Sequence, residues 1–121
     1  MRILIVDDED HLRERLRKTF DGSDHSVFEA ANGREAMTML ARERIDLVIT
    51  DVVMPDVDGL ELVRFLKHDH KDVKAIVLSA SDYSQDEIFL RMARVLGADH
   101  AARKSISAAE LLRVVEGLDD P

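Results

Sequence analysis

The alternation of short apolar runs with segments of helical length is the feature that most constrains the fold of this 121-residue chain. The three clearest runs are Ile3–Val6, Ile45–Thr50 and Ala75–Leu78. Weaker candidates are Ser26–Ala30 and Asp99–Ala102. Continuous apolar runs of this length are typical of strands buried on both faces, as in a parallel sheet.

The intervening segments carry apolar residues at three- and four-residue spacing, which predicts one apolar face on each of five helices. These residues are Leu12, Leu16 and Phe20; Met37, Leu40 and Ala41; Leu62, Val63 and Leu66; Phe89, Met92, Ala93 and Leu96; and Ala108, Leu111, Leu112 and Val115. Candidate N-caps with a glutamate three residues later are Asn32, Asp58 and Ser107, and candidate C-terminal glycines are Gly22 and Gly97. We expect Glu9 and Asp10 to cap the first helix.

Five strand–helix pairs in succession predict an α/β protein: a three-layer (βα)5 doubly wound sandwich around a five-stranded parallel sheet. No linker, repeat or low-complexity segment interrupts the pattern. We therefore expect a single domain over residues 1–118, with residues 119–121 as a frayed tail or the start of a linker.

Composition excludes several classes of function. The chain has no cysteine, which rules out a disulfide scaffold, a thiol nucleophile and a cysteine zinc site. A formal net charge of −8 argues against direct binding of nucleic acid by this domain. Since no apolar run is long enough for a membrane span or a signal-peptide core, we expect a cytoplasmic protein without a membrane role.

Polar and charged residues follow the predicted strands. Asp7 and Asp8 follow the first, Asp51 the third, Ser79 the fourth and Lys104 the fifth. The carboxyl ends of parallel strands meet at one edge of a sheet, so we expect these side chains to converge. Clustered carboxylates need a compensating cation, and oxygen ligands favour Mg²⁺ or Mn²⁺. The set favours phosphoryl transfer to a carboxylate nucleophile.

Taken alone, each of these residues has an ordinary structural role. An Asp pair often lies in a solvated loop, an Asp after a strand often forms a turn, and a single Lys or Ser is usually surface. Only their joint placement at the strand ends favours a site. The five histidines show no ligand spacing, and His68 and His70 are expected at a solvated helix end.

At this point the chain resembles the receiver domain of two-component response regulators over nearly its whole length. The resemblance rests on four segments in order: Ile3–Glu9, Asp46–Gly59, Val77–Ala80 and Gly97–Asp99 leading to Lys104. It implies a flavodoxin-like strand order of 2-1-3-4-5. It also implies a phosphoacceptor that assists its own phosphorylation and dephosphorylation but is not otherwise an enzyme.

The resemblance assigns a role to each site residue. Asp51 matches the phosphoacceptor, which takes its phosphoryl group from a sensor histidine kinase or a histidine phosphotransfer protein. Asp8 matches a direct Mg²⁺ ligand, Asp7 a ligand acting through water, and the backbone carbonyl of Val53 the remaining protein ligand alongside Asp51. Mn²⁺ is an alternative metal. Phosphorylation would control a downstream protein target, with a phosphorylation-dependent dimer as a further expectation.

Two more residues carry the switch in this family. Ser79 matches the hydroxyl that moves to the phosphoryl group, and Lys104 the lysine that contacts a phosphoryl oxygen. Contacts that exist only in the phosphorylated state shift a two-state equilibrium. Pro55 and Gly59 match the loop that shapes the third strand-to-helix connection.

The sequence departs from the family pattern in three places. Ala101 replaces the usual aromatic, so the output is expected to use backbone or helix shifts. Ser105 replaces the usual proline, and we expect a trans bond between Lys104 and Ser105. The segment from Ser79 to Gly97 is a few residues longer than usual, with the extra length expected around Ser81–Glu87.

Val53 and Ser81 stand two residues after the acceptor and the switch hydroxyl, beside the path of an attacking water. Because the Val53 side chain cannot hydrogen-bond that water, we expect slow hydrolysis of the phosphorylated form.

Three alternatives stay open at this stage. Within the family, the chain could be a stand-alone receiver, which we expect from its start at Met1 and the absence of an effector sequence, or a receiver cut from a longer protein. A degenerate receiver would act only as a protein-interaction module. A flavodoxin-like ligand-binding domain would share the sheet order, but the acids that follow Val6 would repel a flavin phosphate.

Overall fold

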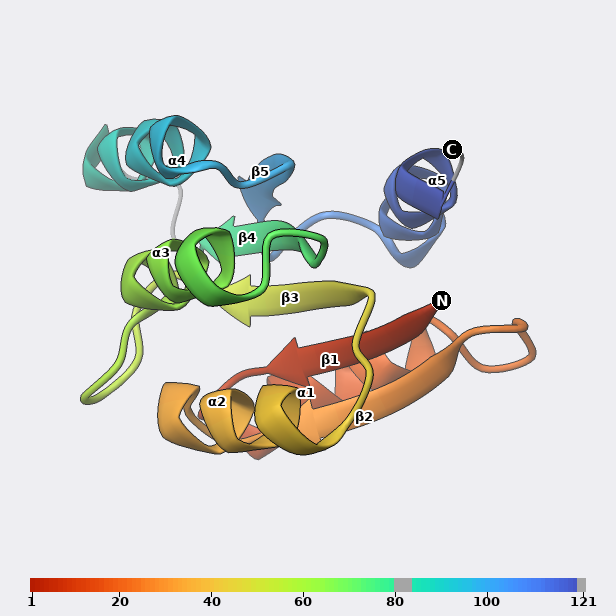
Figure 1. Ribbon diagram of the computed structural model, residues 1–121. Coiled ribbons are helices and arrows are strands. Elements are labelled where there is room, and N and C mark those ends of the chain that lie inside the picture. The colour runs from red at the N-terminus through yellow and green to blue at the C-terminus, as the bar shows by residue number, and fades with distance from the viewer. Residues whose placement is uncertain (80–83, 120–121) are drawn as a thin grey trace.

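A single parallel sheet of five strands forms the centre of the protein. The computed structural model describes residues 1–79 and 84–119. The strands are β1 (Arg2–Val6), β2 (Ser26–Ala30), β3 (Leu47–Asp51), β4 (Lys74–Ser79) and β5 (His100–Arg103). Figure 1 shows them in the order β2-β1-β3-β4-β5, from the bottom to the top of the sheet. The predicted fold class and strand order are confirmed.

Five helices cover the two faces of the sheet. They are α1 (Asp10–Lys18), α2 (Gly33–Arg42), α3 (Gly59–Asp69), α4 (Ser84–Leu96) and α5 (Ala108–Asp119). No described helix is both long enough and apolar enough to cross a membrane. The elements therefore form three layers, helices on either side of one sheet.

Two separate hydrophobic clusters arise because successive side chains of a strand point to opposite faces. Leu4 and Val6 of β1 pack in the cluster that contains the buried residues of α2, α3 and α4. Ile3 and Ile5 pack in the other cluster, with the buried residues of α1 and α5. All four are fully buried, and burying each such side chain contributes roughly 1.5–3 kcal/mol.

The predicted caps are largely present. The side chains of Asn32, Asp58 and Ser107 each accept the backbone N–H of the glutamate three residues later. Gly22 and Gly97 adopt positive φ angles of 78° and 114°. The expectation for the first helix was wrong, because Glu9 is the N-cap but its side chain makes no capping hydrogen bond. Asp7 Oδ1 instead accepts the N–H of Glu9.

Three residues assigned to buried helix faces are exposed: Ala41, Met92 and Ala108. On α4 the buried residues are Leu90 and Ala93 among those described, and Phe89 and Leu96 are partly buried against the core. Met92 lies on the outer face with Ile88 and Val95, and these three are 44%, 59% and 86% exposed. An apolar residue next to a buried one in a helix is rotated by about 100°, which the spacing alone does not resolve.

Strand ends place the polar residues differently from the sequence prediction. Asp51 and Ser79 are the last residues of β3 and β4 rather than the residues after them. Because the strands are parallel, Asp51 and Ser79 lie at the same edge of the sheet.

The last helix extends beyond the expected domain boundary at residue 118, because α5 includes Asp119.

Gly59 allows the start of α3 to approach the end of β3 closely. Its N–H donates to the carbonyl of Val52 at 2.9 Å. A Cβ atom at this position would lie 2.1 Å from the carbonyl oxygen of Asp51 and 2.9 Å from the Cα of Val52. Both are backbone atoms, so no side-chain rotation relieves the overlap.

We predict that Gly59→Ala lowers the free energy of unfolding by roughly 3 kcal/mol, because the backbone around Asp51 must shift. Gly117→Ala is the matched control in α5, where a Cβ meets nothing within 4 Å. This second change should raise stability by up to about 1 kcal/mol through helix propensity. Urea unfolding monitored by circular dichroism measures both, and equal effects would contradict the close approach at Gly59.

Candidate functional site

Three of the predicted site residues form a buried ion cluster at the carboxyl edge of the sheet. Lys104 Nζ lies 2.9 Å from Asp7 Oδ2 and 2.9 Å from Asp51 Oδ2. Their exposed fractions are 7% for Lys104, 0% for Asp7 and 7% for Asp51. The ammonium therefore bridges two carboxylates from different strands: Asp7 directly follows β1, and Asp51 is the last residue of β3.

Backbone contacts hold Lys104 in this position. Its N–H donates to the carbonyl of Ser79 at 2.7 Å, which continues the pairing of β4 with β5. Its own carbonyl accepts a hydrogen bond from the guanidinium of Arg15 in α1. The bond from Lys104 to Ser105 is trans, as the sequence predicts.

The two buried carboxylates keep free coordination capacity. Asp7 Oδ1 accepts the Glu9 N–H at 2.9 Å, while Asp7 Oδ2 has an ion-pair contact with Lys104 but no hydrogen bond of suitable geometry from a described residue. Among the described residues, Asp51 Oδ1 accepts a single hydrogen bond, a long one of 3.4 Å from the N–H of Val53. An under-coordinated buried carboxylate oxygen favours a further cationic partner.

Burial raises the pKa of Asp51. The hydrogen bond and the charge of Lys104 oppose this effect, and the charge of Asp7 adds to it. For Lys104, burial acts to lower the pKa, but the close contacts with the negatively charged carboxylates of Asp7 and Asp51 outweigh burial and leave the pKa raised. Lys104 is therefore a cation at neutral pH. The ionised form of Asp51 destabilises the folded state relative to an exposed aspartate.

The residues fit a hard divalent cation. One carboxylate oxygen each from Asp7, Asp8 and Asp51 lies within 4.8 Å of the others, and Asp8 is exposed. Three carboxylates face a single ammonium, so the cluster keeps an excess of negative charge. An all-oxygen donor set of this kind suits Mg²⁺ or Mn²⁺.

Ser79 lies beside the cluster, with 2% of its surface exposed, one residue beyond the Leu78 that pairs with Asp51. Val53 lies in the loop after β3 and is 65% exposed. Ser81 lies outside the described residues. Of the segment expected to hold extra length, Glu87 lies in α4.

Two arginines of α1 were missed by the sequence reasoning. The guanidinium of Arg13 donates to the Asp7 carbonyl at 2.8 Å and also pairs with Asp10 and Glu29. The Asp10 spacing of three residues signals that helix pair, but no sequence signal connects Arg15 with Lys104. Both contacts link α1 to the strand ends that carry the cluster.

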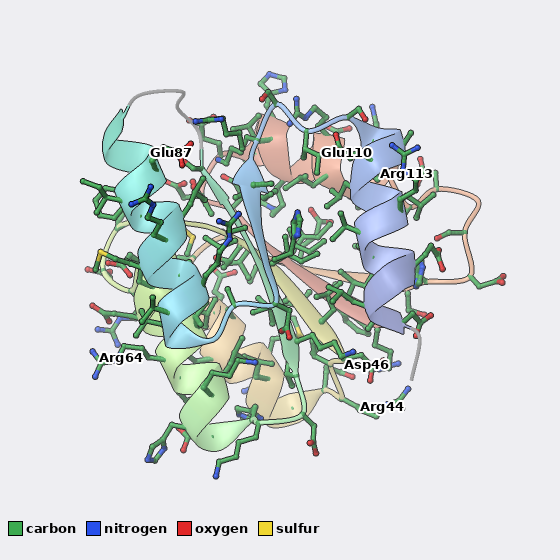
Figure 2. All side chains as sticks on the ribbon, turned by 90° about the horizontal axis from the view of Figure 1, so that it is seen from above. Arg44, Asp46, Arg64, Glu87, Glu110 and Arg113 are labelled. Carbon is green, nitrogen blue, oxygen red and sulfur yellow. The ribbon has the colours of Figure 1, made fainter. Side chains whose placement is uncertain are left out.

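At the position of the usual aromatic, β5 contacts α4 through the Ala101 backbone. Ala101 is buried in β5, and its carbonyl accepts a hydrogen bond from Arg94 of α4 at 3.2 Å. Arg103 forms an ion pair with Glu87 of α4 at 2.5 Å. Figure 2 shows Glu87 near the start of α4. A groove of about 520 Å³ lies between α4, β5 and the start of α5.

Comparison with known proteins finds related sequences. The family model of the response regulator receiver domain matches residues 3–116. The response regulator MprA of Mycobacterium leprae is 40% identical over 119 residues, and that of Mycolicibacterium vanbaalenii is 39% identical over the same length. Each alignment covers 98% of this chain and 50% of the relative, so the chain spans about half the length of these proteins.

A solved structure shows the same likeness. The response regulator protein TrrA from Thermotoga maritima, in complex with Mg²⁺-BeF, superposes with a TM-score of 0.81 and 33% identity over 97% of both chains. The residues that the family model matches include all three members of the ion cluster, Asp7, Asp51 and Lys104. The chain therefore belongs to the response regulator receiver domain family.

Proposed function

We propose that this domain accepts a phosphoryl group on Asp51 from a histidine kinase or a histidine phosphotransfer protein, and that the change controls a partner or output domain. The observation that carries the proposal is the buried carboxylate of Asp51, held 2.9 Å from Lys104 Nζ beside a second buried carboxylate. A buried carboxylate with a permanent cation and spare oxygen ligands suits acceptance of a dianionic group.

The proposed reaction transfers one phosphoryl group between two proteins. An oxygen of Asp51 attacks the phosphorus of a phosphohistidine, the new O–P bond forms as the P–N bond breaks, and the leaving imidazole takes up a proton. Asp51 Oδ1 is the suitable nucleophile, because its sole hydrogen bond from the described residues is the long contact with Val53. Lys104 supplies positive charge to the transferring oxygens.

The metal ligands in this proposal are Asp8, Asp51 and the carbonyl of Val53, with Asp7 acting through water. When bound, Mg²⁺, or Mn²⁺ in its place, would neutralise negative charge on the phosphoryl oxygens. The Mg²⁺-BeF complex of the related TrrA supports this choice of ion. The domain is not otherwise an enzyme in this proposal, since it assists only its own phosphorylation and dephosphorylation.

The switch begins with contacts that need the phosphoryl group. Lys104 exchanges part of its contact with Asp51 for a phosphoryl oxygen, and the Ser79 hydroxyl moves to another. Since Ala101 has no ring to rotate, the change passes through the β5 backbone to α4. Two contacts connect these elements: Arg94 of α4 with the Ala101 carbonyl, and Arg103 of β5 with Glu87 of α4. The outer apolar face of α4 offers a surface for a downstream protein or a phosphorylation-dependent dimer.

The cellular setting follows from the same proposal. Two-component receivers act where their kinases expose their phosphohistidine, so we propose a cytoplasmic location. The curated relatives are about twice as long as this chain. The full coding sequence would show whether an output domain accompanies this receiver in the cell. The domain itself has no direct role in nucleic-acid binding in this proposal.

Incubation with Mg²⁺ and a small acyl phosphate is expected to add one phosphoryl mass to the wild-type chain, as measured by intact-protein mass spectrometry. Asp51→Asn should remove the product entirely, because the amide is not a nucleophile. Asp56→Asn is the matched control, since it removes an exposed carboxylate from the same loop. Absence of product with both the acyl phosphate and a cognate kinase would favour a receiver that acts only as an interaction module.

We predict that Asp51→Asn raises the unfolding free energy at pH 7 without metal by about 1 kcal/mol, a few degrees in Tm. A raised pKa means that the folded state holds the carboxyl proton more tightly than the unfolded state, so the charged form is a cost at neutral pH. As the pH falls through the raised pKa toward the ordinary value of 3.8, the carboxyl is protonated and the gap should close. Thermal melts of both proteins between pH 3.5 and 7 measure it, and a gap that widens in acid would contradict the prediction.

We expect slow loss of the phosphoryl group from the wild type, because the exposed Val53 side chain cannot position water. Val53→Asn should accelerate the loss by about tenfold by offering a hydrogen bond to that water. Val53→Leu is the control, since it keeps an apolar side chain at the same exposed position. The fraction phosphorylated is followed by mass after the donor is removed, and a fast decay that Asn leaves unchanged would argue against the role of Val53.

A further inference from the structure

We propose that His25, Glu116 and Asp119 form a second metal site, selective for Zn²⁺-class ions, at the opposite end of the sheet from the phosphoacceptor. His25 immediately precedes β2, and both carboxylates lie in the last part of α5. One ligand atom from each of these residues lies within 4.8 Å of the others. Three side chains from two distant segments of the chain thus converge on one point.

The two carboxylates are spaced for chelation. Glu116 and Asp119 are three residues apart in α5, so they lie on the same face of the helix in successive turns. Both are exposed and free to adjust around an ion. Glu116 Oε1 already lies 2.9 Å from His25 Nε2.

The imidazole is oriented in advance. The side chain of His25 is 4% exposed, and the ring of Phe20 meets it edge to face with centroids 5.9 Å apart. Its Nδ1 lies 2.9 Å from the N-terminal amine of Met1, which leaves Nε2 directed at Glu116.

Helix α5 contributes negative charge at this point, beside a hollow that Arg2, Arg44 and Lys74 also line. Helix carboxyl termini carry partial negative charge, and the last turn of α5 contains no basic residue. Lys74 Nζ donates to the carbonyl of Leu118 at 2.6 Å, so its contact is with the backbone rather than with the carboxylates. A hollow of about 540 Å³, bordered by Met1 and Asp119, opens beside the cluster and gives an ion access from solvent.

The ligand types distinguish this site from the one around Asp51. Imidazole nitrogen with carboxylate oxygen suits Zn²⁺ and related transition ions, whereas the carboxylate-only set at the other end suits Mg²⁺. Figure 2 looks along the sheet and shows Asp46 near the carboxyl end of α5, far from Glu87 and Glu110 at the phosphoacceptor end. An ion bound here would fasten the end of α5 to the start of β2.

The test is calorimetric titration of ZnCl₂ into the untagged chain in a buffer with excess Mg²⁺. We expect one Zn²⁺ per chain. His25→Gln and Glu116→Gln should each weaken binding by about tenfold or more, since each removes a direct ligand. Asp119→Asn should also weaken it. Circular dichroism melts check the fold of each variant, and Glu116→Gln carries the test if His25→Gln does not fold.

Two controls separate this site from alternatives. His68→Gln removes the histidine of an exposed His–Asp pair, in which His68 Nδ1 and Asp69 lie 2.7 Å apart, and it should leave Zn²⁺ affinity unchanged. Asp51→Asn should also leave it unchanged, which keeps the result independent of the phosphoacceptor proposal. The second site is refuted if the wild type takes up no Zn²⁺, if Glu116→Gln binds as well as the wild type, or if Asp51→Asn abolishes binding.

Discussion

The contact of one ammonium with two buried carboxylates is the interaction on which the rest of the site depends. Lys104 lies between Asp7 and Asp51, and all three are almost completely withdrawn from solvent. Loss of Lys104 would leave two buried carboxylates uncompensated, at a cost of roughly 3–5 kcal/mol, whereas loss of Asp51 leaves Asp7 and Lys104 as a balanced pair. The same imbalance, two buried negative charges and one positive, favours a further cation at the cluster.

The parallel sheet makes this arrangement possible. Asp7 follows β1, Asp51 ends β3 and Lys104 follows β5, so three separate strands bring their charges to one edge of the sheet. Alternating strand residues bury both faces, which fixes the register because a shift of one residue would exchange the two faces. The position of the ion cluster is therefore a consequence of core packing, and Gly59 lets α3 begin close enough to the end of β3 to keep it.

Much of the architecture was predictable from local pattern. The apolar runs and the caps at Asn32, Asp58 and Ser107 depend on near neighbours in the sequence, and they were read correctly. The exposed position of Met92 and the uncapped Glu9 were not, because a helix face and a cap are decided by what packs against them. The resemblance to a family assigned a role to each polar residue at the strand ends. Neither the spacing nor the composition of the sequence contains that information.

The long-range contacts of α1 show most clearly where sequence reasoning ends. Arg15 binds the carbonyl of Lys104 across 89 positions of sequence, next to the Ser105 that replaces the family's usual proline. A proline restricts its own φ and the conformation of the residue before it, whereas serine leaves that segment freer. A guanidinium from a neighbouring helix can supply the missing restraint from outside the segment, because it holds the carbonyl rather than the dihedral angle. The orientation of Lys104 would then depend on α1 as well as on β5. The same helix holds the acidic loop after β1, because Arg13 donates to the Asp7 carbonyl.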